Sequence, residues 1–154
     1  EIESVTTLMA TLNRAAGEVF ARHSDSVSAL TDVTGFGLLG HLMEMLEPSG
    51  LSATLQLSSV PFVAGVRAHA EAGVIAGGSK ANKTAVEERV RRLGAVSDLD
   101  VQLLADAQTS GGLLAAVSPD KADELVDALL TAGAPCAVVI GQLQAGPCSI
   151  RIED

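Results

Sequence analysis

The sequence predicts an α+β fold, a layered α/β sandwich with a mixed sheet. Segments with apolar residues at helical spacing alternate with short apolar runs typical of strands, in the order α-β-α-β-α-loop-α-β-α-β-β. Ala, Val and Leu must build the core, because Phe20, Phe36 and Phe62 are the only aromatic residues. At 154 residues, without a repeat or linker, residues 1–154 fit a single domain, which a longer protein could also contain.

The first half of the chain is predicted to alternate between helices and strands. Apolar spacing gives helices over residues 3–23, 38–47 and 61–72, and strands over residues 27–30 and 51–57. Pro48 and Gly50 end the second helix. Pro61 is well placed to begin the third helix, and Gly73 ends it.

The second half is predicted to begin with a loop and to end with a strand hairpin. The expected elements are a loop at 76–82, a solvated helix face at 87–92, a helix at 99–105, a turn at 108–112 and a strand at 113–117. A helix from residue 119 to Gly133 follows, and then a hairpin of 136–143 with 149–152. Ser118 and Pro119 start the last helix, which Gly133 ends. The hairpin would keep Cys136 far from Cys148, so no disulfide is expected.

Charge and hydropathy narrow the classes of partner. The net charge of −9 argues against nucleic acid and anionic membranes, which select basic surfaces. No apolar run approaches the roughly 18 residues of a membrane span. The opening residues, Glu1-Ile2-Glu3, do not resemble a signal peptide, and the missing initiator Met suggests a fragment. With two cysteines and no expected disulfide, we expect a cytoplasmic protein.

Residues 31–41 form the stretch with the clearest chemistry: an apolar strand, an acid, a glycine-containing turn and a helix N-terminus. That geometry gathers backbone N–H groups and favours an anion. Residues 35–40 also spell G-x-G-x-x-G, but the next strand ends at Ser58-Ser59 without the acid that a dinucleotide site needs. Asp32 would repel a phosphate unless a cation such as Mg²⁺ lay between them. A turn or N-cap carboxylate is the alternative role for Asp32.

Three histidines offer weaker candidates for a site. His41 and Glu44 have the i, i+3 spacing that can bind a metal from one helix. No further ligand joins them in sequence, so a solvated or capped helix face is the expectation. His23 and His69 have no recognisable partners and are expected at the surface.

Two further segments leave alternatives open. Residues 77–79 (Gly-Gly-Ser) fit either a ligand-wrapping loop or a plain connection between helices. Lys80 and Lys83 are better explained as exposed lysines that balance Glu87 and Glu88 than as phosphate ligands. Residues 109–112 fit either an anion nest or a turn into a tightly packed strand, and we favour the packing role.

Residues 31–41, TDVTGFGLLGH, resemble the corresponding segment of selenophosphate synthetases (selenide, water dikinases). The resemblance covers nearly the whole chain. It continues through Leu12-Asn13, Val60-Pro61, Gly77-Gly78-Ser79 with Asn82, and residues 108–114. It matches only the C-terminal domain of those enzymes. It therefore implies the fold of the C-terminal domain of the aminoimidazole ribotide synthetase superfamily.

The resemblance also implies a function and a set of site residues. The parent enzyme would make selenophosphate, AMP and phosphate from ATP, selenide and water. Asp32 would be a Mg²⁺ ligand at the ATP site. The nucleotide- or phosphate-binding positions would be Thr34, Gly35, Gly37, Gly77, Gly78 and Asn82. The catalytic Cys or selenocysteine and the essential Lys belong to the family's N-terminal domain, so this chain alone is expected to be inactive and to close the site from one side. Its own N-terminal domain and a second copy in a homodimer are the implied partners.

Some positions depart from the family pattern. The family's PGGT element, with an Arg before the Asn, here has Ala76, Ser79 and Ala81. Ala107 replaces the Pro of DPQTSGG, which affects the stiffness of that loop. The alternatives are a domain of another enzyme of the superfamily, aminoimidazole ribotide synthetase-like or thiamine-phosphate kinase-like, and a non-catalytic binding module.

Overall fold

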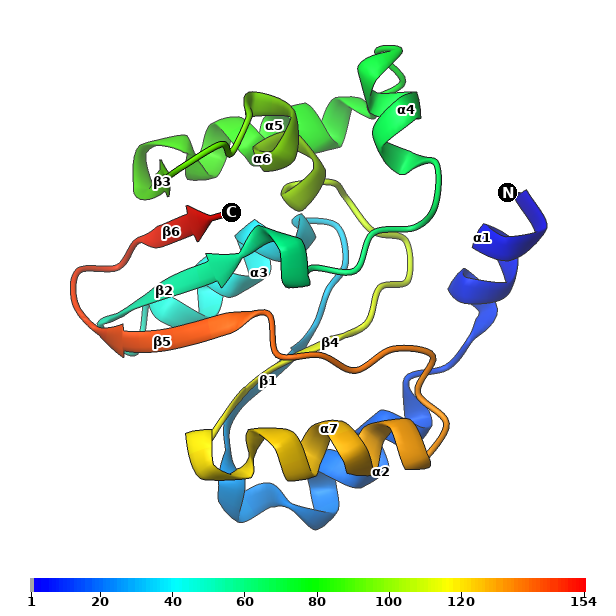
Figure 1. Cartoon of the computed structure of the whole chain (residues 1–154), viewed down its shortest axis with the longest axis vertical. Coiled ribbons are helices and arrows are strands. Elements are labelled where there is room, and N and C mark those ends of the chain that lie inside the picture. Colours follow the sequence, from blue (N-terminus) through cyan, green and yellow to red (C-terminus); the bar gives the residue numbers. More distant parts are fainter. Residues whose placement is uncertain (1) are drawn as a thin grey trace.

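The computed structural model describes residues 2–154, in which helices surround two sheets (Figure 1). The helices are α1 (Ile2–Ala10), α2 (Arg14–Arg22), α3 (Gly37–Leu46), α4 (Val66–Glu71), α5 (Gly77–Val86), α6 (Asp98–Leu104) and α7 (Ala122–Thr131). The strands are β1 (Val27–Asp32), β2 (Leu51–Gln56), β3 (Val90–Arg92), β4 (Leu113–Val117), β5 (Gly141–Ala145) and β6 (Ile150–Glu153). Short 3₁₀ turns cover Ser24–Ser26, Leu57–Ser59, Glu87–Arg89 and Pro119–Lys121. The predicted α+β layered fold is confirmed.

The larger sheet is mixed, with the strand order β3-β6-β2-β5. Strand β6 runs parallel to β2 and β3, whereas β5 runs antiparallel to β2. The predicted hairpin of the last two strands is therefore wrong, because β2 lies between them. The arrangement places Ile150 and Ile152 of β6 in the middle of the sheet, where both are fully buried. Cys136 and Cys148 are free.

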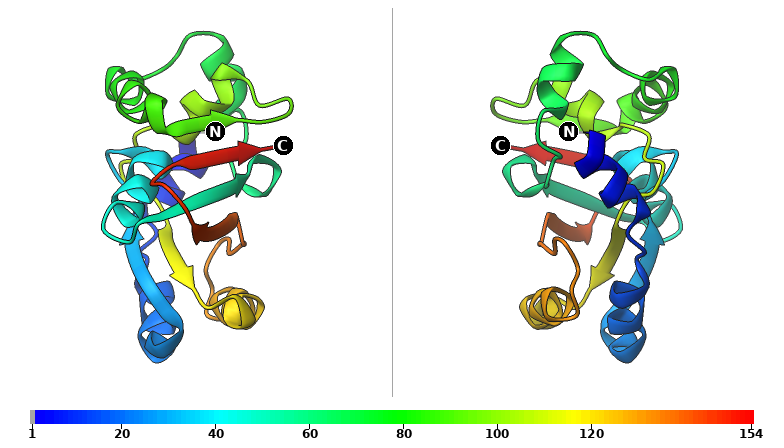
Figure 2. Two further views of the ribbon diagram at one scale, coloured as in Figure 1. Left: turned by 90° about the vertical axis from the view of Figure 1, so that its left-hand side faces the viewer. Right: turned by 90° about the vertical axis from the view of Figure 1, so that its right-hand side faces the viewer.

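The smaller sheet pairs β1 with β4 in antiparallel register, from Val27 opposite Val117 to Asp32 opposite Leu113. Its lower end meets the α2–α7 pair, and its upper end leads toward α3 and the α4–α6 group, as Figures 1 and 2 show. The smaller sheet thus connects the α2–α7 pair with the rest of the molecule, and the end of β1 lies between these two parts.

The core lies between α3, the larger sheet and α6. The predicted apolar face of α3 is buried, with Leu39 and Leu46 fully inaccessible and Leu42 and Met43 nearly so. Helix α6 begins with a capping box, in which the Ser97 hydroxyl and the Asp100 carboxylate each accept a hydrogen bond from the other residue's backbone N–H. Among residues 2–154, no helix is long and apolar enough to cross a membrane.

Two helices have bounds in the structure that differ from the predicted ones. The helix expected over residues 3–23 is divided into α1 and α2, and at the break the Asn13 amide donates to the Gly111 carbonyl oxygen at 2.9 Å. Helix α1 then projects from the body of the protein, and none of its described residues is buried (Figure 1). The helix expected from Pro61 begins only at Val66, because Gly65 adopts a left-handed conformation with φ 85°.

Two further predictions are wrong. Residues 76–82 are not a loop, because α5 starts at Gly77; burial of Ser79 and Val86 outweighs the low helix propensity of the two glycines. Residues 87–92 are not a helix face. They form a 3₁₀ turn and then β3, whose backbone pairs with β6 over Val90–Arg92. Pairing with a distant strand has no signal in the local charge pattern.

Candidate functional site

Asp32 is the last residue of β1, and its side chain is exposed. The strand's alternating burial turns Leu30 and Asp32 outward and Thr31 partly inward. Within residues 2–154, no group of three or more His, Cys, Asp or Glu residues is arranged to hold a metal ion. One free carboxylate fits Mg²⁺, which typically takes one or two protein carboxylates and completes its shell with water and phosphate oxygens.

The loop after Asp32 is held by backbone hydrogen bonds to residues 108–112. The Val33 N–H donates to the Gly112 carbonyl oxygen at 2.9 Å, and the Gly111 N–H donates to the Val33 carbonyl oxygen at 3.1 Å. The Gln108 N–H donates to the Thr34 carbonyl oxygen at 3.0 Å. The packing role expected for residues 109–112 fits this contact, since a Cβ atom on Gly111 would overlap the Val33 carbonyl oxygen.

Gly37 and Gly35 have different surroundings. Gly37 is buried with φ 69°, and a Cβ there would lie 2.6 Å from the Ala105 carbonyl carbon. Gly37 therefore lets the start of α3 pack against the end of α6. Gly35 is exposed, and a Cβ there would meet nothing within 4 Å in the described chain. Of the two, only Gly35 has open space for a ligand to approach its backbone.

Asn82 on α5 is brought to the same loop. Its amide nitrogen donates to the Gly35 carbonyl oxygen at 2.8 Å and to the Ala105 carbonyl oxygen at 3.1 Å. Asn82 thus joins α5, the loop and the end of α6, which is a positioning role. Gly77 and Gly78 lie at the exposed start of α5, where a Cβ atom on either would meet nothing within 4 Å among the described residues.

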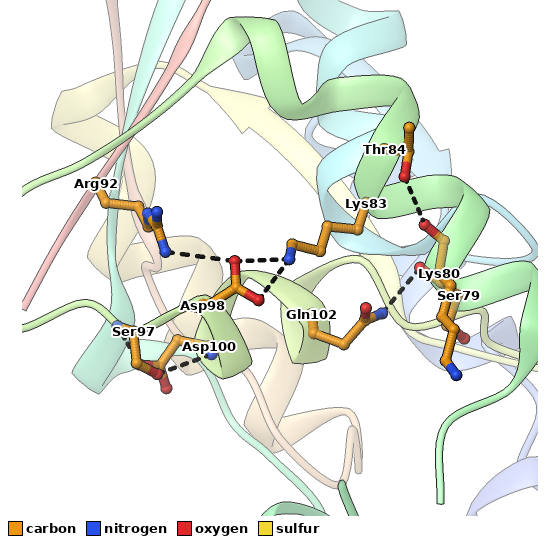
Figure 3. Close-up of polar contacts among 9 residues, drawn as sticks. All are labelled: Ser79, Lys80, Lys83, Thr84, Arg92, Ser97, Asp98, Asp100 and Gln102. Carbon is orange, nitrogen blue, oxygen red and sulfur yellow. Dashed lines mark hydrogen bonds and ion pairs between the residues drawn. The ribbon is translucent and has the colours of Figure 1, made fainter. Parts of the chain in front are cut away.

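Sequence reasoning missed the importance of Ser79, which is fully buried. Its hydroxyl donates to an Asp106 carboxylate oxygen at 2.5 Å and accepts from the Ala107 N–H at 3.1 Å. Its carbonyl oxygen accepts from the Gln102 amide at 2.9 Å (Figure 3). Ser79 therefore fixes α5 against the segment that leads into residues 108–112. A serine beside two glycines gives no signal that it will be buried.

His41 is buried, which corrects the expectation of a solvated or capped helix face. Its Nε2 lies 3.2 Å from the Thr34 hydroxyl, and its Nδ1 lies 3.1 Å from a Glu44 carboxylate oxygen. The Phe36 ring lies 5.6 Å away, centroid to centroid. The cause is side-chain direction on α3, since a helical side chain leans toward the preceding turn. His41 thus anchors Thr34 from behind the loop.

Lys83 is engaged by Asp98 and not by Glu87 or Glu88. Its ammonium donates to both Asp98 carboxylate oxygens at 2.6 Å, and Arg92 approaches one of them at 3.5 Å (Figure 3). The Lys83 hydrogen bond holds the pKa of Asp98 below its usual range. Lys83 is thus committed within the described chain, while Lys80 is exposed as predicted.

Asp100 is the buried carboxylate of the α6 cap. Burial alone would raise its pKa, but hydrogen bonds from Ser97 and Arg67 outweigh burial and hold the pKa below its usual range. The Ser97 hydroxyl donates at 2.5 Å and its N–H at 2.7 Å to the same carboxylate oxygen. This carboxylate is used in the structure of α6 and is not open to a ligand.

Of the two histidines expected at the surface, His69 is exposed and His23 is not fully so. His23 is half-buried, with Nδ1 2.9 Å from the Val19 carbonyl oxygen and Nε2 4.0 Å from Glu124. His69 is exposed. Neither lies in the loop after Asp32. The structure brings Gly37 of α3 and Asn82 of α5 up to Thr34 and Gly35 in the loop that follows Asp32, whereas Gly77 and Gly78 lie at the exposed start of α5.

Comparison with known proteins identifies the family to which this chain belongs. The profile of "AIR synthase related protein, C-terminal domain" matches residues 3–153. A selenide, water dikinase from Myxococcus xanthus is 49% identical over 94% of this chain and 41% of its own length. A selenide, water dikinase from Rhizobium meliloti is 43% identical over 99% of this chain and 42% of its own length.

A third relative of the same name, from Sulfurimonas denitrificans, is 45% identical over 80% of this chain and 35% of its own length. The chain thus spans about two fifths of the length of the relatives from Myxococcus xanthus and Rhizobium meliloti. The resemblance identified from residues 31–41 is confirmed by these matches. This chain belongs to the family of AIR synthase related protein C-terminal domains.

Proposed function

We propose that this chain is the C-terminal domain of an enzyme that makes selenophosphate, AMP and phosphate from ATP, selenide and water. The observation that carries the proposal is the 49% identity over 94% of the chain to a selenide, water dikinase. The domain contributes to an ATP and Mg²⁺ site and depends on a separate N-terminal domain for catalytic residues. By itself it is inactive, and a cytoplasmic location remains our prediction.

Asp32 is the proposed Mg²⁺ ligand. Its carboxylate is exposed at the end of β1, so a hydrated cation can reach it from solvent. When bound, Mg²⁺ neutralises negative charge on the phosphate groups of ATP. The main chain beside Asp32 is held in place by the backbone hydrogen bonds that Val33 makes with Gly111 and Gly112.

The residues after Asp32 are proposed to bind and orient phosphate. Gly35 leaves its backbone accessible, and Asn82 fixes its carbonyl group by a 2.8 Å hydrogen bond. His41 and Gly37 shape the loop from the buried side. The exposed N-terminal residues of α5, Gly77 and Gly78, are the proposed second approach to phosphate.

The proposed partners are the N-terminal domain and, in the complete enzyme, a second copy. Leu30 and Phe36 flank the loop on either side of Asp32 in sequence, and they are 43% and 56% exposed. Large exposed apolar side chains beside a charged site are typical of surfaces that another domain covers. A domain seated there would exclude water from Asp32 and its cation.

The test is Asp32→Asn in the polypeptide as its gene encodes it. We expect the rate of selenide-dependent ATP consumption to fall at least about a hundredfold, since the cation loses its charged protein ligand. The rate is measured by ³¹P NMR, which detects the products selenophosphate and AMP. Asp25→Asn, at another exposed aspartate, is the matched control and should keep full activity. Normal turnover in Asp32→Asn would show that Asp32 has no part in the mechanism. Turnover by the unaltered enzyme of another phosphoryl acceptor in place of selenide would favour an aminoimidazole ribotide synthetase-like or thiamine-phosphate kinase-like enzyme.

A further inference from the structure

A cavity of about 230 Å³ opens on the larger sheet, away from the loop after Asp32. It lies where β2 and β6 begin and β5 ends. Its polar lining comes from Ser52, Arg91, Gln144, Ser149 and Arg151. None of these residues belongs to the proposed ATP and Mg²⁺ site, so the cavity needs an explanation of its own.

Arg91 and Arg151 are direct partners in the parallel pairing of β3 with β6. Paired residues on adjacent strands project from the same face of a sheet, and the strands lie about 4.8 Å apart. Both arginines are exposed and both line the cavity. The two arginine side chains therefore leave the sheet side by side, and both line the same opening.

The charge of this pair is not neutralised within residues 2–154. Arg14, Arg67, Arg89 and Arg92 each contact a carboxylate, whereas the described chain gives Arg91 and Arg151 neither a hydrogen bond nor an ion pair. No carboxylate from the described residues lines the cavity either. Like charges placed directly opposite one another destabilise a sheet. Arg91 and Arg151 therefore form a local concentration of positive charge in a chain whose net charge is −9.

We propose that this cavity binds a phosphate group, either as inorganic phosphate or on a small phosphorylated molecule. The planar guanidinium group suits bidentate hydrogen bonding to phosphate oxygens, and two such groups can share one phosphate. The Ser52 and Ser149 hydroxyls already donate to the carbonyl oxygens of Gln144 and Pro147. The two arginines therefore supply the binding charge.

The size of the cavity limits the ligand. Pockets for drug-sized ligands range from about 300 to 1,000 Å³, whereas this one measures about 230 Å³. Gly146 brings the turn between β5 and β6 close to Ser52, since a Cβ on Gly146 would lie 2.8 Å from the Ser52 hydroxyl oxygen. The cavity thus encloses a phosphate group with little more than a small attached fragment, and the rest of a larger ligand would lie outside it.

The test is calorimetric titration of the intact polypeptide with inorganic phosphate at low ionic strength. We expect saturable binding that Arg91→Ala and Arg151→Ala each weaken about tenfold or more, as loss of a charge-assisted pair predicts. Arg22→Ala is the matched control, because Arg22 is exposed and does not line the cavity, and it should leave the affinity unchanged. Arg151→Lys keeps the charge without the planar fork and should bind with intermediate affinity.

A parallel titration of Asp32→Asn separates the two sites. The cavity should bind phosphate equally well in that variant, whether or not Asp32 serves the proposed enzyme. Absence of saturable binding, equal loss in Arg22→Ala, or an equal response to chloride would overturn the proposal. Loss of phosphate binding in Asp32→Asn alone would assign the phosphate to the other site and equally overturn it. If the arginines instead contact an acidic surface of another polypeptide, phosphate will not bind.

Discussion

The loop after Asp32 and the α5–α6 pair are neighbours that keep their shapes by different means. Backbone hydrogen bonds and two close glycine contacts hold most of the loop, with Asn82 and His41 bonded to it from α5 and α3, and Asp32 and Phe36 stay exposed. In α5 and α6, polar side chains hold one another, as Figure 3 shows for Lys83 with Asp98 and for Ser97 with Asp100. The Asp32 carboxylate of the first region is therefore open to a ligand, whereas the paired polar side chains of the second region are structural.

The largest effect should come from adding one methyl group to the loop. Gly111→Ala would drive its Cβ into the Val33 carbonyl oxygen, a backbone atom that cannot move without breaking the loop. We expect the free energy of unfolding to fall by about 2–4 kcal/mol in urea denaturation. Gly112→Ala is the control, since its Cβ meets nothing within 4 Å among the described residues. Equal stability of the two variants would show that the loop is not held by close backbone contact.

A smaller loss is expected in the α5–α6 pair. Ser79→Ala removes the hydroxyl that donates to Asp106 and accepts from the Ala107 N–H, which leaves both groups without that partner. We expect the free energy of unfolding to fall by about 1–3 kcal/mol. Ser58→Ala, at an exposed serine, should change it by less than about 0.5 kcal/mol. If Ser79→Ala were neutral, side chains would not be what holds α5 in place.

The α5–α6 pair should also lose stability in acid, through Asp100 of α6. The pKa of Asp100 is held low in the folded protein by Ser97 and Arg67, despite its burial. Its stabilising contribution is thus complete above about pH 4, the ordinary pKa of an aspartate, and is lost as the pH falls through the lower folded-state pKa. We expect Asp100→Asn to be less stable at neutral pH and to show a shallower fall in Tm at acid pH. An unchanged acid slope in that variant would mean that other carboxylates govern acid unfolding.

The smallest effect on stability should come from Asp32→Asn. The side chain is exposed at the end of β1, so we expect the free energy of unfolding to change by less than about 0.5 kcal/mol. Urea denaturation beside wild type provides the measurement. A large loss would mean that Asp32 has a structural role, and any loss of activity in this variant would then have to be reinterpreted.

Local patterns in the sequence predicted those elements whose signals are local. The apolar repeat of α3, the strand β4 and the end of α7 before Gly133 all follow from neighbouring residues. The predicted start of the last helix at Pro119 was wrong, because Pro119–Lys121 form a 3₁₀ turn and α7 begins at Ala122. The pairing of β3 with β6 and the separation of β5 from β6 depend on contacts across the chain, which no short window contains. Local helix propensity was likewise misleading at Gly77, where packing decides.

The candidate site was predicted in a similar way. Residues 31–41 located the loop and its exposed carboxylate, because a strand, a glycine turn and a helix follow one another directly. The sequence did not reveal that Asn82 would bond to the Gly35 carbonyl oxygen, or that His41 would lie behind Thr34, because both depend on how helices pack. Their roles in positioning the loop required the three-dimensional arrangement.

The position of β6 has a consequence for the order of folding. This strand follows the other described strands in the chain, yet it lies between β2 and β3, and β3 has no other strand partner in the described chain. During synthesis, residues 90–92 must therefore wait for residues 150–152 to emerge from the ribosome before the larger sheet can be completed. A premature stop codon or a proteolytic cut just before Ile150 would leave a gap in the middle of the sheet and expose an edge of β2 to other chains.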